Sequence, residues 1–356
     1  MSAVPIDALV VTHLPNVQYL TGFSGSAGAV ILVPGACVLV VDFRYVTAAR
    51  AVAQPLDGVV TVSTFDTSYD EALIQILLGE GSSRVGIEGA YLPVSRFNAL
   101  SSGLAAQSPL PVAPAVSAPI LMPTERLVER ARIIKDAAEI AAFREAGRRL
   151  AQVGRDVPAL VGEGRTEQAI AVDIETALRQ AGFSRPAFET IVASGPNGAL
   201  PHARPTTRVV RAGDATVLDF GGVYDGYCVD LTRTVQVGAV SAAIQRLYAA
   251  VAEAQEAAIR AVRPGQTASV VDAAARSVLE RHGLGEAFGH GTGHGLGLEV
   301  HEEPRIGRAT PRVPDERLEP GMVFTIEPGA YVPGLGGVRI EDDVLVTASG
   351  CEVLTR

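Results

Sequence analysis

An internal repeat in the C-terminal two-thirds of this 356-residue sequence constrains its fold more than any other feature. The segment Val161-Gly-Glu-Gly-Arg-Thr166 leads into a predicted helix ending at Gly182. At a constant offset, Val262-Arg-Pro-Gly-Gln-Thr267 leads into one ending at Gly283. Each threonine is placed to cap a helix N-terminus, and each glycine to end the helix. Because repeat arrays stack several copies, two copies predict one α/β domain with pseudo-twofold symmetry.

The repeat continues beyond the helices and brings chemically similar residues into register. Residues 193–205 match residues 292–304, and residues 212–219 match residues 320–327. The residues that coincide are His202 with His301, Asp219 with Glu327, and, in a third short match, Asp230 with Glu341. Each half therefore contributes two carboxylates and one histidine in the same order.

The dipeptide Asp225-Gly226 lies between two apolar runs and predicts a tight β-hairpin, because these residues tolerate positive φ. A two-residue loop would put Asp230 opposite Gly221. Asp219 would then lie on the same face as Gly221, since side chains alternate along a strand. Diagonal neighbours lie roughly 7–8 Å apart at Cα. Two carboxylates that close need a cation or a shared proton between them, so the hairpin predicts a metal site.

Both Asp219 and Glu327 follow apolar runs that are typical of buried strands. Buried carboxylates without partners are costly, so we expect Asp219, Asp230, Glu327 and Glu341 to converge, with His294 added by the second half alone. Oxygen-rich ligands with one imidazole suit Mn²⁺, Co²⁺ or Zn²⁺. Four carboxylates can bridge two ions about 3.5 Å apart, which activate a shared water.

Three histidines flank the predicted metal strands: His202, His290 and His301. We interpret them as candidates to donate to a developing oxyanion or to move a proton, and we interpret His13 and His282 as structural. The glycines of residues 289–297 allow close backbone approach. A phosphate cradle is the rival interpretation of that segment, but its spacing fits neither G-x-G-x-x-G nor the P-loop.

Arg339 is predicted to share a strand face with Glu341, two residues away. There it would hold carboxylates or bind substrate. A purely structural ion pair is an equal alternative for this residue.

Residues 1–105 alternate strand and helix signals, which predicts a small α/β domain. Residues 21–28 are interpreted as a turn between strands. Residues 108–124 are rich in proline and have the composition of a linker. We therefore expect an N-terminal domain over residues 1–122 and a catalytic domain over residues 123–356.

Composition excludes several partners. The net charge is -9, the pI is about 5.3 and there is no basic run, so we expect neither nucleic acid nor a membrane surface as a partner. The cysteines, Cys37, Cys228 and Cys351, show no C-x-x-C spacing, which indicates neither a disulfide framework nor a cysteine zinc site. Without a signal-like N-terminus or an apolar run that spans a bilayer, we expect a cytoplasmic protein.

Five segments resemble those of the pita-bread metallopeptidases, specifically the Xaa-Pro peptidases aminopeptidase P and prolidase: Leu218-Asp-Phe-Gly, Val229-Asp-Leu-Thr-Arg-Thr234, Gly293-His-Gly-Leu-Gly-Leu-Glu-Val-His-Glu302, Ile326-Glu-Pro-Gly329 and Val338-Arg-Ile-Glu-Asp342. Residues 15–25 resemble the family's N-terminal domain, although the first predicted strand, residues 8–12, begins earlier than is usual there. The resemblance implies a pseudo-twofold pita-bread catalytic domain and a homodimer.

The resemblance also implies roles for individual residues. Two divalent ions, Mn²⁺ in the first place and Co²⁺ or Zn²⁺ as alternatives, would be held by Asp219, Asp230, His294, Glu327 and Glu341. His202, His290 and His301 would surround the substrate, and Glu327 would lie beside the bridging water.

We therefore predict a dinuclear Xaa-Pro aminopeptidase that hydrolyses the N-terminal Xaa-Pro bond of small proline-containing peptides. The nearest alternative is an Xaa-Pro dipeptidase (prolidase), which must cap the substrate's C-terminal carboxylate. A creatinase-like hydrolase works without metal and is not expected to keep all five ligands. A catalytically silent binding module and, because of the extra N-terminal domain, a methionine aminopeptidase are less favoured.

Overall fold

A computed structural model describes residues 5–56, 58–107, 118–311 and 315–356. The chain divides into two compact units, Met1–Arg130 and Ala131–Arg356, and each is described by itself. Within the described residues, no helix combines the length and apolar character needed to cross a membrane.

The first unit is built on a mixed six-stranded sheet in the order β4-β3-β2-β1-β5-β6. Its strands are β1 (Ala8–Val11), β2 (Ala29–Val33), β3 (Ala36–Val41), β4 (Val60–Thr64), β5 (Arg84–Glu88) and β6 (Ile120–Thr124). Its helices are α1 (Leu14–Thr21), α2 (Val46–Ala53), α3 (Tyr69–Gly79), α4 (Val94–Gln107) and the 3₁₀ helix η1 (Gln54–Leu56), and α5 (Leu127–Arg132) reaches the division between the units.

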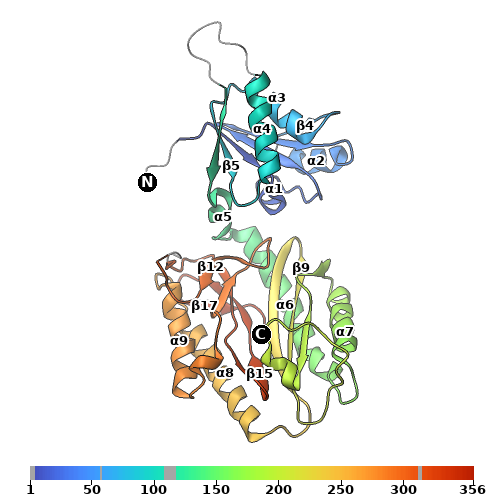
Figure 1. The fold of residues 1–356 in the computed structure, drawn as a ribbon, viewed down its shortest axis with the longest axis vertical. Coiled ribbons are helices and arrows are strands. Elements are labelled where there is room, and N and C mark those ends of the chain that lie inside the picture. The colour runs from blue at the N-terminus through green and yellow to red at the C-terminus, as the bar shows by residue number, and fades with distance from the viewer. Residues whose placement is uncertain (1–4, 57, 108–117, 312–314) are drawn as a thin grey trace. The chain divides into compact units, whose positions relative to one another are not determined.

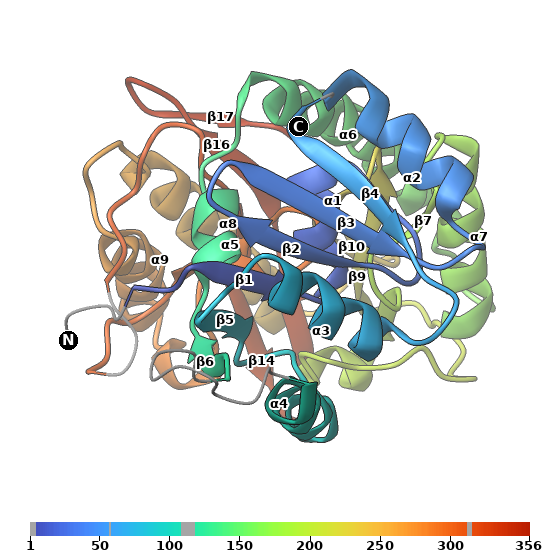
Figure 2. The same ribbon diagram turned by 90° about the horizontal axis from the view of Figure 1, so that it is seen from above.

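Helices cover both faces of this sheet, because its central strands are apolar on both sides. Val10 of β1 and Ile31 of β2 pack with residues of α3 and α4, whereas Leu9 and Val11 pack with residues of α1 and α2. Figure 2 shows β1 to β4 side by side, with α2 and α3 on opposite sides of them. The predicted small α/β domain is confirmed.

Two details of the first unit differ from the sequence-based expectation. Helix α1 is missed by the prediction, because its eight residues are too few to show a clear helical period. The prediction of a linker over residues 108–124 is wrong for the last five residues, which form β6 and pair in parallel with β5. Residues 108–117 lie outside the described residues. Because β6 belongs to this sheet, the units divide at residue 130 rather than at residue 122.

The second unit has strands enclosed by four long helices, α6 (Ala137–Asp156), α7 (Glu167–Gln180), α8 (Ala242–Ala261) and α9 (Ala268–Arg281) (Figure 1). One sheet has the order β10-β9-β7, with β8 also paired to β9, and another has the order β12-β11-β13-β16-β17. The strands of the first are β7 (Arg185–Pro186), β8 (Ile191–Ser194), β9 (Ala215–Tyr224) and β10 (Tyr227–Gln236). Those of the second are β11 (Gly293–Gly295), β12 (Glu302–Ile306), β13 (Val323–Ile326), β16 (Asp342–Val346) and β17 (Cys351–Val353).

Strands β14 (Gly329–Val332) and β15 (Gly336–Arg339) form a separate pair, and the 3₁₀ helices are η2 (Val157–Leu160), η3 (Gly195–Ala199) and η4 (Gly285–Ala287). The unit has two hydrophobic cores, one under α6 and α7 and the other under α8 and α9. The chain therefore has the mixed α/β, pseudo-twofold architecture that the repeat predicts.

The predicted hairpin register is confirmed. Tyr227 pairs with Tyr224 and Asp230 with Gly221. The turn residues have positive φ, 49° at Asp225 and 86° at Gly226. Asp219 therefore lies diagonally across the ladder from Asp230.

The second half does not form a matching continuous hairpin. The β13–β16 ladder ends at Ile326 and Asp342, and the β14–β15 ladder begins at Gly329 and Arg339. Pro328, which has no N–H to donate, lies in the gap. Both glutamates of this half, Glu327 and Glu341, are therefore at the interruption, where the backbone is free of ladder pairing.

The predicted N-caps Thr166 and Thr267 both begin helices, and only Thr267 lacks a capping hydrogen bond from its side chain. Asp136 and Glu139 form a capping box at the start of α6, and the Thr166 hydroxyl accepts from the backbone of α7. Thr267 is the N-cap of α9, but its side chain forms no capping hydrogen bond and instead contacts the Ser269 hydroxyl.

Two glycines within α6 give a matched test of its packing. A Cβ at Gly147 would lie 2.5 Å from the backbone oxygen of Leu354, whereas a Cβ at Gly154 would lie 2.5 Å from Cδ2 of the Leu231 side chain. We expect Gly147→Ala to destabilise the unit by about 1–3 kcal/mol, because backbone must move. Gly154→Ala should be nearly neutral, since a side-chain tip can shift and the helix gains roughly 0.5–1 kcal/mol.

Thermal unfolding of the two variants beside the parent protein tests this expectation. Equal melting temperatures for the two variants would contradict the packing of the C-terminal segment against α6.

Candidate metal centre

Three potential ligands from separate segments converge in the second unit. One carboxylate oxygen each from Asp230 and Glu341 and one imidazole nitrogen of His294 all lie within 4.8 Å of one another. Asp230 comes from β10, His294 from β11, and Glu341 immediately precedes β16. The two halves of the repeat thus meet at this point.

The other two predicted ligands lie beside this cluster. Glu327 Oε1 is 3.6 Å from His294 Nε2, which is also 3.9 Å from Asp230 Oδ2. Asp219 is close enough that its negative charge helps to raise the pKa of both Asp230 and Glu341. One oxygen of Asp219, Oδ2, accepts a hydrogen bond from Arg339.

Several oxygens of this cluster have no partner in the protein. Asp219 Oδ1, Asp230 Oδ1 and Glu341 Oε1 are buried and accept no hydrogen bond from any part of the chain that the structure describes. Such groups are costly to bury unless something compensates their charge. Oxygen donors joined by one imidazole match the preferences of hard and borderline divalent cations. The residues present therefore fit a divalent metal.

The electrostatics of the cluster agree with this assignment. Burial, followed by the charge of neighbouring carboxylates, raises the pKa of Asp230 and of Glu341 well above the ordinary range. Burial also raises the pKa of Glu327 to about 8. Burial lowers the pKa of His294 to about 3, so its imidazole is neutral at pH 7, as a metal ligand must be.

Neighbouring groups orient the cluster and were not identified from the sequence. The Thr232 hydroxyl donates to Glu341 Oε2 at 2.5 Å, and the backbone N–H of Asp230 donates to Asp343 Oδ2 at 3.0 Å. These contacts join strands of the two halves. The only local signal is that Thr232 shares the strand face of Asp230, two residues away.

Arg339 lies beside the cluster with its guanidinium directed into the protein. It donates to Asp219, to the Tyr331 hydroxyl at 2.8 Å, to the Pro201 carbonyl at 3.2 Å and to Thr232 Oγ1 at 3.2 Å. The side chain is 4% exposed. Of the roles considered from the sequence, the structure therefore supports holding a carboxylate, and four of the five guanidinium N–H groups have acceptors within the chain.

His290 is fixed at both ring nitrogens. Its Nδ1 lies 2.7 Å from the Gly291 carbonyl and therefore carries the hydrogen, which leaves Nε2 to accept from the Tyr331 hydroxyl at 3.0 Å. Burial lowers the pKa of His290 to about 4, so the ring is neutral at pH 7. A directed chain of hydrogen bonds thus runs from Arg339 through Tyr331 to His290. Tyr331 carries no sequence signal of this role.

The loop that bears His290 is anchored by α9. Asp272, which is 1% exposed, accepts from the backbone N–H and the hydroxyl of Thr292 at 3.2 and 2.8 Å. Its partner Arg276 donates to the carbonyls of Phe288 and His290. The helix therefore fixes the backbone on both sides of His290.

His202 and His301 differ from His290. Both residues are exposed, and neither ring forms a hydrogen bond with another residue that the structure describes. The His301 ring lies edge-on to His294, with ring centroids 4.3 Å apart. The charge of His202 contributes to the lowered pKa of His290, after burial and Arg339, which places these rings near each other. Their ring nitrogens are free to meet a substrate.

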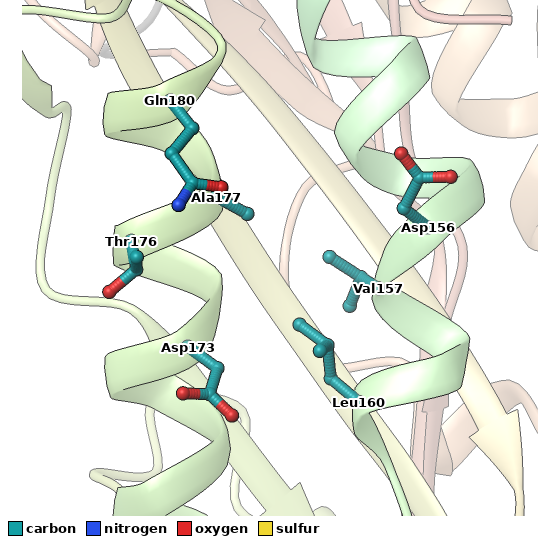
Figure 3. A pocket seen from close by; sticks show the side chains of 7 residues that line it. All are labelled: Asp156, Val157, Leu160, Asp173, Thr176, Ala177 and Gln180. Atoms are coloured by element: carbon teal, nitrogen blue, oxygen red, sulfur yellow. The ribbon is translucent and has the colours of Figure 1, made fainter.

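A separate pocket of about 310 Å³ lies between α6, η2 and α7 (Figure 3). Its lining contains none of the predicted site residues and consists of Asp156, Val157, Leu160, Asp173, Thr176, Ala177 and Gln180. Asp173 is already paired with Arg165. This pocket is therefore distinct from the metal cluster.

Known proteins resemble the chain along its whole length. Residues 141–348 match metallopeptidase family M24, and residues 1–134 match the creatinase/prolidase N-terminal domain. A Bacillus anthracis structure described as an Xaa-Pro dipeptidase has a TM-score of 0.90 and 35% identity, covering 99% of this chain and 93% of its own. An Xaa-Pro dipeptidase from Pyrococcus horikoshii is 34% identical over 99% of this chain and 93% of its own length.

A second similar structure has a different described activity. An X-Pro aminopeptidase from Thermotoga maritima has a TM-score of 0.85 and 32% identity, covering 99% of this chain and 96% of its own.

Replacing one buried carboxylate tests the electrostatic description. Because the pKa of Glu341 is raised in the folded protein, its ionised form opposes folding at pH 7 in the absence of a cation. We expect Glu341→Gln to melt at a higher temperature than the parent protein in a chelator. Added Mn²⁺ should raise the melting temperature of the parent protein but hardly that of the variant.

Exposed Glu280 provides the control, since Glu280→Gln should change neither measurement. A Glu341→Gln variant that gains as much as the parent protein from Mn²⁺ would argue against Glu341 as a ligand.

Proposed function

The chain belongs to metallopeptidase family M24, and from this membership we propose that it is a metal-dependent Xaa-Pro dipeptidase, or prolidase. The sequence predicts an Xaa-Pro aminopeptidase first and a dipeptidase as the nearest alternative. We now favour that alternative. It is supported by the similarity to Xaa-Pro dipeptidases over nearly the full length of both chains. The cluster of carboxylates and one histidine is the observation that carries the hydrolytic part of the proposal.

Two divalent ions, with Mn²⁺ in the first place, would be held by Asp219, Asp230, His294, Glu327 and Glu341. When bound, the ions would act as Lewis acids on the scissile carbonyl and would lower the pKa of water in the site. The unpartnered oxygens of Asp219, Asp230 and Glu341 support this ligand set.

Glu327 is proposed to transfer a proton from the attacking water to the leaving group. Its side chain is mostly buried beside His294, and burial raises its pKa to about 8, which suits a group that exchanges a proton near neutral pH. It would take a proton from the attacking water and return it to the prolyl nitrogen as the bond breaks. The backbone N–H of Glu327, which donates to the Thr292 carbonyl at 2.7 Å, keeps the residue in place.

We propose different roles for the three histidines that are not metal ligands, His202, His290 and His301. His202 and His301 have free ring nitrogens and would donate to the carbonyl oxygen as negative charge develops on it. His290, with both nitrogens engaged, would keep Tyr331 and Arg339 oriented toward Asp219. His290 would limit the space available to the substrate by its position and would not form a hydrogen bond with it.

The substrate class follows from the chemistry of the prolyl bond. Proline removes the amide N–H and fixes φ, so a site that accepts its ring need not satisfy that donor. A dipeptidase must also neutralise the free carboxylate of the substrate. We propose a residue other than Arg339 for this role, because Arg339 is buried and four of its five N–H groups have acceptors within the chain. The homodimer and the separate roles of the two units, Met1–Arg130 and Ala131–Arg356, stay predictions.

Substrate length separates the two candidate activities. After chelation and addition of Mn²⁺, we expect an Xaa-Pro dipeptide to be hydrolysed with a kcat/KM at least about tenfold above that of the matching Xaa-Pro-Yaa tripeptide, because a dipeptidase pairs the terminal carboxylate. Elemental analysis of the active protein should find two Mn²⁺ per chain.

A preference for the tripeptide would instead support the Xaa-Pro aminopeptidase, the activity described for the Thermotoga maritima protein. An Xaa-Ala dipeptide serves as the control for the prolyl requirement.

A further inference from the structure

Glu167 is a fully buried carboxylate at the start of α7, outside the metal cluster. Six hydrogen bonds from neighbouring residues converge on its two oxygens. Oε1 accepts from the backbone N–H and hydroxyl of Ser194, both at 2.7 Å, and Oε2 from the N–H and hydroxyl of Thr206 at 3.0 and 2.6 Å. The Asn197 side-chain amide reaches both oxygens at 3.0 and 3.1 Å.

These partners are the two ends of the loop that carries His202. Ser194 is the last residue of β8, and Thr206 follows His202 along the chain. One carboxylate thus closes the loop at its base. The loop is held again at its middle, where the Pro201 carbonyl accepts from Arg339 at 3.2 Å.

We propose that Glu167 is a positioning residue for His202, which it serves by fixing both ends of the loop over residues 194–206. The inference rests on the proposed function, which puts the His202 ring at the substrate carbonyl. Because the ring forms no hydrogen bond within the described part of the chain, its place depends on the backbone that carries it.

The chemistry requires a carboxylate rather than an amide. A glutamine at position 167 would keep the shape but would replace one acceptor oxygen by an NH₂ group. In either orientation that group faces a backbone N–H, of Ser194 or of Thr206, and leaves a buried donor unsatisfied. One end of the loop must then move. A displacement of about 1 Å at a catalytic group can cost on the order of 100-fold in rate.

The second half of the repeat contains a comparable arrangement. On α9, the helix that matches α7, buried Asp272 anchors Thr292 and, through Arg276, the backbone around His290. The two carboxylates occupy different positions of their helices, yet each fixes a histidine-bearing loop. Anchoring of these loops from the outer helices is therefore a feature of both halves.

A double-mutant cycle with Glu167→Gln and His202→Ala tests the proposal on the Mn²⁺-loaded full-length protein. With an Xaa-Pro dipeptide, we expect Glu167→Gln alone to lower kcat/KM roughly 10- to 100-fold, with Mn²⁺ affinity unchanged. In the His202→Ala background, the same change should lower kcat/KM by less than about twofold, because the residue to be positioned is gone.

Glu139→Gln is the matched control, because Glu139 is a buried carboxylate in the first turn of α6 whose side chain accepts from Asp136 and Tyr227, neither of which lies in a histidine loop. It should leave kcat/KM unchanged. Thr206→Val removes the hydroxyl that donates to Glu167 and accepts from the Arg208 N–H, but keeps the backbone N–H that donates to Glu167. It should show a smaller effect of the same kind and replaces Glu167→Gln if that variant does not fold. The proposal is overturned if Glu167→Gln lowers kcat/KM equally in the parent protein and in the His202→Ala variant. It is also overturned if His202→Ala alone leaves kcat/KM unchanged.

A readout without substrate separates this proposal from the proposed function. In histidine-labelled protein, the NMR signal of the His202 ring should shift or broaden in Glu167→Gln, while those of His13 and His282 stay in place. An unchanged His202 signal overturns the positioning role. A shifted signal in a protein that hydrolyses no Xaa-Pro peptide supports it and overturns the proposed function alone.

Discussion

Mutual repulsion of buried carboxylates is the constraint on which the catalytic unit depends. Asp219, Asp230, Glu327 and Glu341 come from two halves of a repeated chain, yet they share one small buried volume. Arg339 compensates one of them, and Thr232 donates to another. One oxygen each of Asp219, Asp230 and Glu341 has no donor among the described residues. A fold that concentrates negative charge in this way is stable only with cations or protons in the cluster, so metal affinity and folding are linked.

The strands that carry these acids can be predicted from the sequence, whereas the side chains that surround the acids cannot. Asp225-Gly226 fixes the β9–β10 register, because a two-residue turn leaves one pairing possible. The broken second hairpin was not predicted, since the repeat conceals the interruption next to Pro328. Tyr331, Glu167 and Asp272 act through contacts between distant segments. No local pattern distinguishes them from other polar residues, and only the folded chain brings them to the histidine loops.

The site combines rigid and less constrained parts. His290 is held at both ring nitrogens and through its backbone, and His294 is buried within the metal cluster. His202 and His301 reach the solvent with unbonded rings, while the backbone of His202 is fixed by Glu167 and Arg339. With the proposed function, such an arrangement would keep the metal-binding side constant and leave the substrate-facing side able to adjust its rotamers. If related proteins prefer peptides of different length, we expect the residues responsible to lie on this adjustable side of the site.

The Thr232 hydroxyl has a consequence for the unit as a whole. It has one hydrogen, which it gives to Glu341, and it receives the Nε–H of Arg339, so a residue of the first half joins two residues of the second. Neither half can therefore assemble a working centre on its own. A protein made from a single half would have to associate with another copy of itself, face to face, before it could bind ions as this chain is built to do.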